Sequence, residues 1–187
     1  MWPYALLYWS VCAWVFWPEF RILRNAGRVR TKTDAKSLQV ILFGLNLAYL
    51  AAYVIAWVPW LALRSHRVAV FFLGMALLVA GSLLRRHCWR MLGASFTGDV
   101  RASAGQEVVV RGAYAYVRHP SYTAAILMNL GIALALGSWA AVLLLLIASF
   151  FVYGYRIAVE ERALLEAIGE PYRRYIETRK RLIPFVY

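Results

Sequence analysis

The sequence predicts an all-α integral membrane protein with five transmembrane helices, the last two of which form a hairpin. Of its 187 residues 63% are hydrophobic, and the mean hydropathy is +0.59, which is more apolar than the core of a soluble domain requires. Five apolar runs approach the roughly 20 residues that a helix needs to cross a bilayer. Most Lys and Arg residues lie between or after these runs, as topology signals do.

The first apolar run, residues 2–21, is predicted to be a retained helix rather than a signal peptide. It has neither a basic start nor a small-residue cleavage site. Its Trp and Tyr side chains suit the membrane interface, where aromatic rings anchor transmembrane helices. We therefore expect this run to be the first span of the protein.

The second and third runs cover residues 38–63 and 68–84, and the fourth and fifth cover 122–136 and 138–159. Only Gly137 and Ser138 mark the boundary between the last two runs. A connection this short allows only a tight turn between antiparallel helices. We predict that the fourth and fifth helices pack together as a hairpin within the membrane.

The distribution of basic residues predicts the orientation of the chain. With five spans and the amino terminus outside, 19 of the 21 Lys and Arg residues fall on one side of the membrane. The positive-inside rule makes that side cytoplasmic, together with the carboxyl terminus. Topology and anionic lipid headgroups thus account for the net charge of +12, and no nucleic-acid partner is needed.

The polar segment Arg118-His119-Pro120 immediately precedes the fourth apolar run. Because proline is favoured in the first turn of a helix, this segment predicts a helix start with His119 near the cap position. Free backbone amides at such a start attract a carboxylate or phosphate, and Tyr114 and Tyr122 add hydrogen bonds and aromatic surface. An alternative is that His119 is only a cap or a headgroup contact and that the tyrosines form an interfacial belt.

Arg156 and Glu160 share one face of the fifth helix, and Glu161 is turned about 100° away. Because the hairpin brings this end beside the start of the fourth helix, we expect His119, Tyr122, Arg156 and Glu160 to converge. Ionisable groups so close to a bilayer are costly unless they are used, which favours a functional site. The alternative is a weak intrahelical ion pair at the membrane edge.

The common cofactor and metal signatures are absent from the sequence. The chain has no GxGxxG after a strand, no GxxxxGKS/T, no HExxH and no GxSxG. Cys12 and Cys88 lie in or beside different apolar runs, with no CxxC and no His at metal spacing. We expect two small buried cysteines, no disulfide and no metal site.

Three separated segments in the second half of the chain resemble segments of one known protein family. They are residues 105–122 (GQEVVVRGAYAYVRHPSY), Arg156 with Glu160-Glu161, and residues 169–175 (GEPYRRY) followed by Leu182-Ile183-Pro184. In order and spacing they resemble the isoprenylcysteine carboxyl methyltransferase family. The related phospholipid N-methyltransferases share the Arg-His-Pro and Glu-Glu elements but match the closing Tyr and Pro segment less well.

The resemblance implies an S-adenosylmethionine-dependent methyltransferase whose cytoplasmic cofactor pocket is covered by the loop before the fourth helix and by the carboxyl-terminal tail. It implies that Arg156 orients a substrate carboxylate and that Glu160 acts with it in catalysis. The cofactor contacts that it implies are Gln106, Glu107, Val108, Val109, Tyr114, His119, Pro120, Ser121, Tyr122 and Glu160. Many members have His where this chain has Gln106, which keeps a donor and an acceptor but cannot carry charge.

The implied acceptor is a lipophilic, prenylcysteine-like carboxylate, and its methylation by a sulfonium requires no metal. We expect one domain, residues 1–187, in which residues 1–90 hold three spans and residues 91–187 form the catalytic region. The chain is shorter at its amino terminus than larger eukaryotic relatives, which is typical of a minimal prokaryotic form. We therefore expect a multi-pass protein of a prokaryotic inner membrane.

Other functions are compatible with the same residues. The acceptor could be a phospholipid amine or the hydroxyl of a long-chain phenol or pyrone, which would need a proton acceptor such as Glu160 or His119. A membrane sterol-type reductase would bind a nicotinamide cofactor instead. A transporter or non-enzymatic scaffold would place Asn46 and Asn129 along a path, although we expect each to form an interhelical hydrogen bond.

Overall fold

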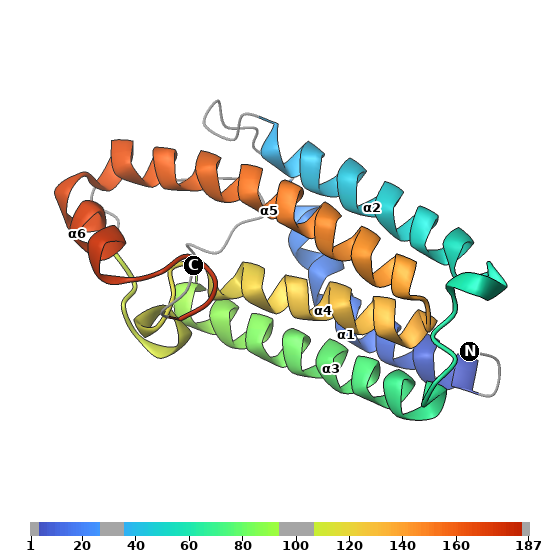
Figure 1. Cartoon of the computed structure of the whole chain (residues 1–187). Coiled ribbons are helices and arrows are strands. Elements are labelled where there is room, and N and C mark those ends of the chain that lie inside the picture. Colours follow the sequence, from blue (N-terminus) through green and yellow to red (C-terminus); the bar gives the residue numbers. More distant parts are fainter. Residues whose placement is uncertain (1–3, 27–35, 94–106, 185–187) are drawn as a thin grey trace.

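The computed structural model describes residues 4–26, 36–93 and 107–184, and these residues form helices and turns without a β-strand (Figure 1). The predicted all-α class is thereby confirmed. The α-helices are α1 (Ala5–Ala26), α2 (Ser37–Ile55), α3 (Arg67–Leu92), α4 (Pro120–Leu136), α5 (Trp139–Ile168) and α6 (Glu170–Thr178). Two short 3₁₀ helices, η3 (Pro59–Leu61) and η5 (Gly112–Ala115), lie in the connections.

Three of the helices, α2, α3 and α5, are long and apolar enough to cross a membrane. The shorter helix α4 is apolar as well. Large hydrophobic side chains such as Phe43, Leu47 and Phe150 are exposed along these helices, as expected for surfaces that face lipid. The protein is therefore a multi-pass membrane protein, and its count of five spans stays a prediction.

Several predicted boundaries were wrong. The runs predicted to end at residues 21 and 159 continue as helices to Ala26 and Ile168. The apolar run 38–63 is helical only to Ile55, because Pro59 begins the 3₁₀ helix η3. The run predicted to end at residue 84 continues as helix α3 to Leu92. Hydropathy falls where Arg85 and Arg86 begin, but arginine favours a helix, and both side chains bond to α1.

Helices α3 and α4 approach each other closely through glycines. A Cβ atom at Gly131 would lie 2.6 Å from the backbone oxygen of Gly74, and one at Gly81 would lie 2.7 Å from the backbone oxygen of Ala124. Small residues of this kind allow transmembrane helices to pack backbone against backbone. This contact fixes the position of α4, whose first turn carries much of the predicted site.

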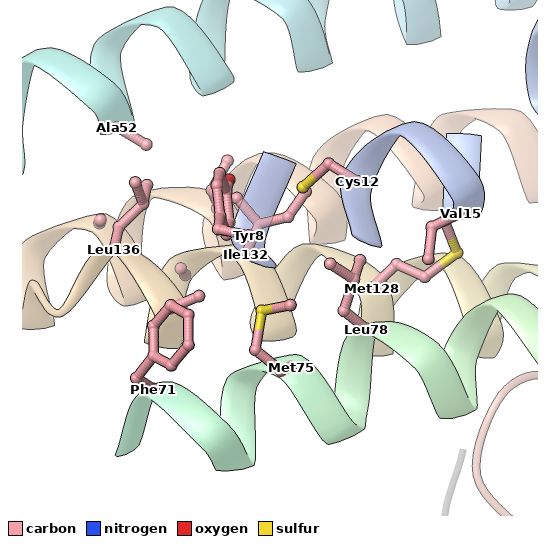
Figure 2. Packing of buried hydrophobic residues seen from close by; sticks show 14 of the residues in the cluster. Tyr8, Cys12, Val15, Ala52, Phe71, Met75, Leu78, Met128, Ile132 and Leu136 are labelled. Carbon is pink, nitrogen blue, oxygen red and sulfur yellow. The ribbon is translucent and has the colours of Figure 1, made fainter. Parts of the chain in front are cut away.

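The buried hydrophobic cluster joins α1 to α2, α3, α4 and α5. Figure 2 shows Tyr8, Cys12 and Val15 of α1 lying above Leu78 of α3 and Met128 of α4. Both cysteines, Cys12 and Cys88, are free and buried. Helix α1 is therefore part of the packed bundle.

The predicted hairpin of α4 and α5 is present. Gly137 ends α4 with a φ of 70°, a left-handed conformation that glycine adopts without strain. Ser138 caps α5, and its Oγ accepts a hydrogen bond from the amide of Ala141 at 3.4 Å. The second half of α5 consequently runs past the start of α4 and continues to α6 at the same end of the bundle (Figure 1).

Polar side chains within the bundle connect the helices. Asn129 of α4 accepts from the Tyr49 hydroxyl at 2.5 Å and donates to Ser149 Oγ at 2.8 Å, which confirms the interhelical bond expected for it. The same expectation for Asn46 was wrong. Asn46 is exposed and donates to the Leu42 carbonyl of its own helix, because it lies on the outer face of α2.

Candidate functional site

The site is built around the first turn of α4. His119 occupies the cap position of this helix and Pro120 its first position, as the Arg-His-Pro segment predicted. The carbonyl of His119 accepts from the amides of Tyr122 at 3.0 Å and Thr123 at 3.2 Å. The His119 side chain makes no capping bond and is buried. Its ring is therefore available for contacts with α5.

Three aromatic rings stack from this turn toward the middle of the bundle. The centroids of His119 and Tyr122 are 5.6 Å apart, and those of Tyr122 and Tyr153 are 5.4 Å apart. The interplanar angles are 25° and 26°, so the rings are nearly parallel. The stack ties the start of α4 to α5 and fixes the direction of the Tyr122 hydroxyl.

The hydroxyl of Tyr122 joins the two charged residues of α5. It donates to Glu160 Oε2 at 2.5 Å and accepts from Arg156 Nε at 3.2 Å. The Nδ1 atom of His119 lies 4.0 Å from the same Glu160 oxygen. The structure thus brings together His119, Tyr122, Arg156 and Glu160, as the hairpin predicted.

Ser37, the first residue of α2, completes this network. Its Oγ accepts from Arg156 Nη1 at 2.5 Å, and both residues are buried. No sequence pattern pointed to Ser37, because only the packing of α2 on α5 brings it to Arg156. The hydroxyls of Ser37 and Tyr122 orient the guanidinium from two sides.

The adjacent acids Glu160 and Glu161 lie in different environments. The Glu160 side chain is 30% exposed, whereas that of Glu161 is 9% exposed. Glu161 pairs with Arg118 at 3.3 Å, with His119 Nε2 at 3.1 Å and with Arg181 at 2.9 Å. Glu161 was not among the predicted site residues, although its offset of about 100° from Glu160 on the helix indicates that it meets other partners.

The carboxyl-terminal segment runs across the start of α4. The amides of Arg118 and His119 donate to the carbonyls of Lys180 at 2.8 Å and Arg181 at 2.9 Å. Thr123 Oγ1 donates to the Leu182 carbonyl at 2.7 Å. These bonds, together with the pair between Glu161 and Arg181, hold this segment against α4.

Helix α6 packs against the connection that precedes α4. The Tyr175 hydroxyl donates to the Tyr114 carbonyl at 2.7 Å, and burial raises the pKa of Tyr175 to about 12. Burial also raises the pKa of the Tyr114 hydroxyl. Both tyrosines therefore stay protonated at neutral pH.

The remaining predicted site residues are placed as follows. Pro120 and Ser121 are buried in the first turn of α4. Glu107 is exposed, and Val108 and Val109 are partly buried in the connection that leads to η5. Gln106 lies outside the described residues.

An apolar groove of about 490 Å³ lies beside Tyr153, one ring of the aromatic stack. Tyr153 belongs both to the stack and to the groove, so the two are contiguous. The groove lies along the middle of α5, and Leu182 of the carboxyl-terminal segment also lines it. Its lining residues are Ile126, Leu146, Ser149, Phe150, Phe151, Tyr153, Gly154, Tyr155, Ile157 and Leu182.

Comparison with known proteins decides the family. The model of the isoprenylcysteine carboxyl methyltransferase family matches residues 72–166, just over half of the chain. The chain belongs to this family. The matched region contains most of α3, all of α4 and nearly all of α5, so it includes His119, Tyr122, Arg156 and Glu160.

Curated relatives carry the same family name. The chain is 31% identical over 114 residues to a protein-S-isoprenylcysteine O-methyltransferase of Schizosaccharomyces pombe, with 60% of this chain and 48% of the relative covered. The enzyme of that name from Xenopus laevis is 25% identical over 194 residues, with 98% of this chain and 66% of the relative covered. The chain thus spans about half to two thirds of the length of these relatives.

A solved structure shows the same fold. The eukaryotic intramembrane Ras methyltransferase of the isoprenylcysteine carboxyl methyltransferase family superimposes with a TM-score of 0.67 at 25% identity. The match covers 76% of this chain and 52% of that chain. The fold that the resemblance implied is confirmed, whereas the prokaryotic origin stays a prediction because these named relatives are eukaryotic.

Proposed function

We propose that this protein is an S-adenosylmethionine-dependent methyltransferase that methylates a lipophilic acceptor at the cytoplasmic face of the membrane. The preferred acceptor is the carboxylate of a prenylcysteine-like molecule. One observation carries the proposal: in a chain of this family, the Tyr122 hydroxyl joins Arg156 and Glu160 where α4 begins and α5 leaves the apolar core.

The residues at the start of α4 fit the proposed cofactor. S-adenosylmethionine combines a sulfonium cation with a flat adenine ring and polar ends, and when bound it supplies an electrophilic methyl group. The Glu160 carboxylate is partly exposed and can accept from or pair with a positive group. The stack of His119, Tyr122 and Tyr153 holds the Tyr122 hydroxyl against this carboxylate and so fixes its position.

Arg156 is suited to orient an acid. Its guanidinium donates to the hydroxyl oxygens of Tyr122 and Ser37. A carboxylate accepts more strongly than a hydroxyl and matches the guanidinium fork in both oxygens. An acceptor carboxylate would therefore compete successfully with these hydroxyls. Held in this way, it is already an anionic nucleophile and requires no general base, so the task of the chain is orientation.

The groove beside Tyr153 favours a lipophilic acceptor. It is lined mainly by apolar side chains and is contiguous with the stack that contains Tyr122. A hydrocarbon tail in this groove would keep its polar end near Arg156. Burial of the tail contributes about 0.8 kcal/mol for each methylene that leaves water, so even a short isoprenoid would be held at the membrane.

The purified protein in lipid nanodiscs provides the test. We expect it to bind S-adenosylhomocysteine in calorimetry, and to transfer labelled methyl to a farnesylcysteine analogue with a free carboxylate. The matched control acceptor is the methyl ester of the same analogue, which should stay unlabelled. Phospholipids and alkylphenols are tested as alternative methyl acceptors in the same assay.

Each alternative has its own outcome in this experiment. Labelling of a phospholipid or an alkylphenol, but not of the free acid, would assign the other acceptor classes. Binding of a reduced nicotinamide dinucleotide without binding of S-adenosylhomocysteine would assign a reductase. Binding of neither cofactor would refute the proposed enzyme and favour a transporter or scaffold.

A further inference from the structure

Arg85 joins three helices at the same end of the bundle. Its Nε and Nη2 donate to the two carboxylate oxygens of Glu19 on α1, the second of these bonds measuring 3.0 Å. Its Nη1 donates to the carbonyl of Ser121 at 3.0 Å and to the Ser121 hydroxyl at 2.7 Å. One guanidinium from α3 therefore connects α1 to the first turn of α4.

The environment makes this connection rigid. The side chains of Arg85 and Glu19 are only 17% and 18% exposed. A partly buried arginine needs a paired carboxylate, because an unpaired charge at such depth is strongly unfavourable. The two-point contact with Glu19 fixes both the position and the plane of the guanidinium. Glu19 thereby determines where Nη1 meets Ser121.

Ser121 lies between the residues that form the proposed cofactor site. It follows Pro120 and precedes Tyr122, whose hydroxyl meets Glu160 at 2.5 Å. A shift of the Ser121 backbone would carry Tyr122 with it. A shift of Tyr122 by much less than the length of a side chain is sufficient to lower the affinity of a preorganised site for its ligand.

We propose that Glu19 is a positioning residue for the cofactor-binding end of α4 and that it acts through Arg85 on Ser121. This inference rests on the proposed methyltransferase function. It assigns a role to α1, which lies outside the residues 72–166 that match the family. In this view the first helix is part of the catalytic apparatus, although it supplies no group that touches the cofactor.

The test compares the contact of Glu19 with Arg85 to a second contact between α1 and α3, which Arg86 makes. Arg86 donates to the Trp14 carbonyl at 2.8 Å, lies over the Trp14 ring and donates to Ser82 Oγ at 3.3 Å, so these contacts lie on α1 and α3. Variants Glu19→Gln and Arg86→Met are measured in nanodiscs for the Kd of S-adenosylhomocysteine and for thermal unfolding. Glu19→Asp, which restores the charge, serves as the conservative variant.

We expect Glu19→Gln to raise the Kd of S-adenosylhomocysteine about tenfold, and Glu19→Asp to recover most of that loss. Arg86→Met should lower the unfolding temperature but leave the Kd within about twofold of the wild type, since no contact with the cofactor end of α4 is lost. If Glu19→Gln does not fold, the Arg85→Lys variant takes its place and should still raise the Kd.

A double-mutant cycle separates positioning from simple stability. Because both residues act on the same turn, the effects of Glu19→Gln and Ser121→Ala on the Kd should be less than additive. An unchanged Kd in folded Glu19→Gln or in its replacement Arg85→Lys, an equal effect of Arg86→Met, or full additivity with Ser121→Ala would each overturn the inference. Failure of the wild type to bind S-adenosylhomocysteine would instead refute the proposed function, so the two failures are distinguishable.

Discussion

At the scale of single residues, the two adjacent acids of α5 differ in their burial and in their partners. Glu161 is surrounded by Arg118, His119 and Arg181, so its charge is used to hold the carboxyl-terminal segment against α4. Glu160 is more exposed and its carboxylate meets the Tyr122 hydroxyl. A bound cation can therefore approach Glu160, whereas the carboxylate of Glu161 already forms ion pairs within the protein.

Substitution of Arg156 tests the proposed acceptor clamp. Arg156→Lys keeps a charge but loses the planar fork, so we expect turnover to fall about a hundredfold while the Kd of S-adenosylhomocysteine changes little. Initial rates with the farnesylcysteine acceptor and calorimetry measure the two quantities. Arg162→Lys, at an exposed position of the same helix, is the control and should retain full turnover. Unchanged turnover in Arg156→Lys would remove this residue from the mechanism.

Substitution of Glu160 tests the proposed cofactor contact. Glu160→Gln keeps the size of the side chain and its bond to Tyr122 but removes the charge, so we expect the Kd of S-adenosylmethionine to rise about tenfold. The control is Glu166→Gln, because Glu166 is exposed on the same helix. An identical binding isotherm for Glu160→Gln and the wild type would contradict the assignment.

At the scale of helices, the close contact of α3 with α4 positions the first turn of α4. Gly74 and Gly131 face each other, and neither position has room for a Cβ atom. The polar connection through Asn129, Tyr49 and Ser149 then holds α2, α4 and α5 together. Packing of small residues and hydrogen bonds, rather than the hydrophobic effect, determines such contacts within a membrane.

The glycine contact gives a stability prediction. A Cβ atom at Gly131 would lie 2.6 Å from backbone atoms of both Gly74 and Leu78, so Gly131→Ala should destabilise the protein by about 1–3 kcal/mol through overpacking. Gly154→Ala is the matched control, because nothing lies within 4 Å of its Cβ position. Thermal unfolding in detergent measures both variants. Equal unfolding temperatures for the two would show that the helices tolerate a larger separation.

At the scale of the whole molecule, the site occupies one end of a bundle whose helices alternate in direction. The connection between α2 and α3 lies at the opposite end, where the amide of Leu63 donates to the Gly137 carbonyl at 2.7 Å. The site end also carries α6 and the basic carboxyl-terminal segment (Figure 1). We propose that this end is cytoplasmic, since the basic residues gather there.

Labelling of single cysteines in intact cells tests this orientation. Ser65→Cys lies in the connection between α2 and α3, and Glu177→Cys lies on α6; both positions are exposed. A membrane-impermeant maleimide added outside should label Ser65→Cys and should reach Glu177→Cys only after lysis. The native cysteines are buried and give a low background. The opposite pattern would reverse the orientation.

Much of the fold could be predicted because each feature depends on local sequence. The two-residue boundary at Gly137 and Ser138 predicted the hairpin, and Pro120 predicted the start of α4. The convergence of Tyr122, Arg156 and Glu160 followed from these two features. The helix ends near Ile55 and Leu92 could not be predicted from hydropathy. A hydropathy value does not distinguish a 3₁₀ turn from an α-helix, or a paired arginine from an unpaired one.

The sequence by itself determined the all-α membrane class, the family and the residues that gather at the start of α4, because hydropathy, proline and helical spacing act over short distances. Only the tertiary structure decided the partners of the buried charges. Ser37 meets Arg156, Glu19 meets Arg85 and Arg181 meets Glu161 across 119, 66 and 20 positions of the chain. The packing of whole helices creates such pairs, and no local pattern records them.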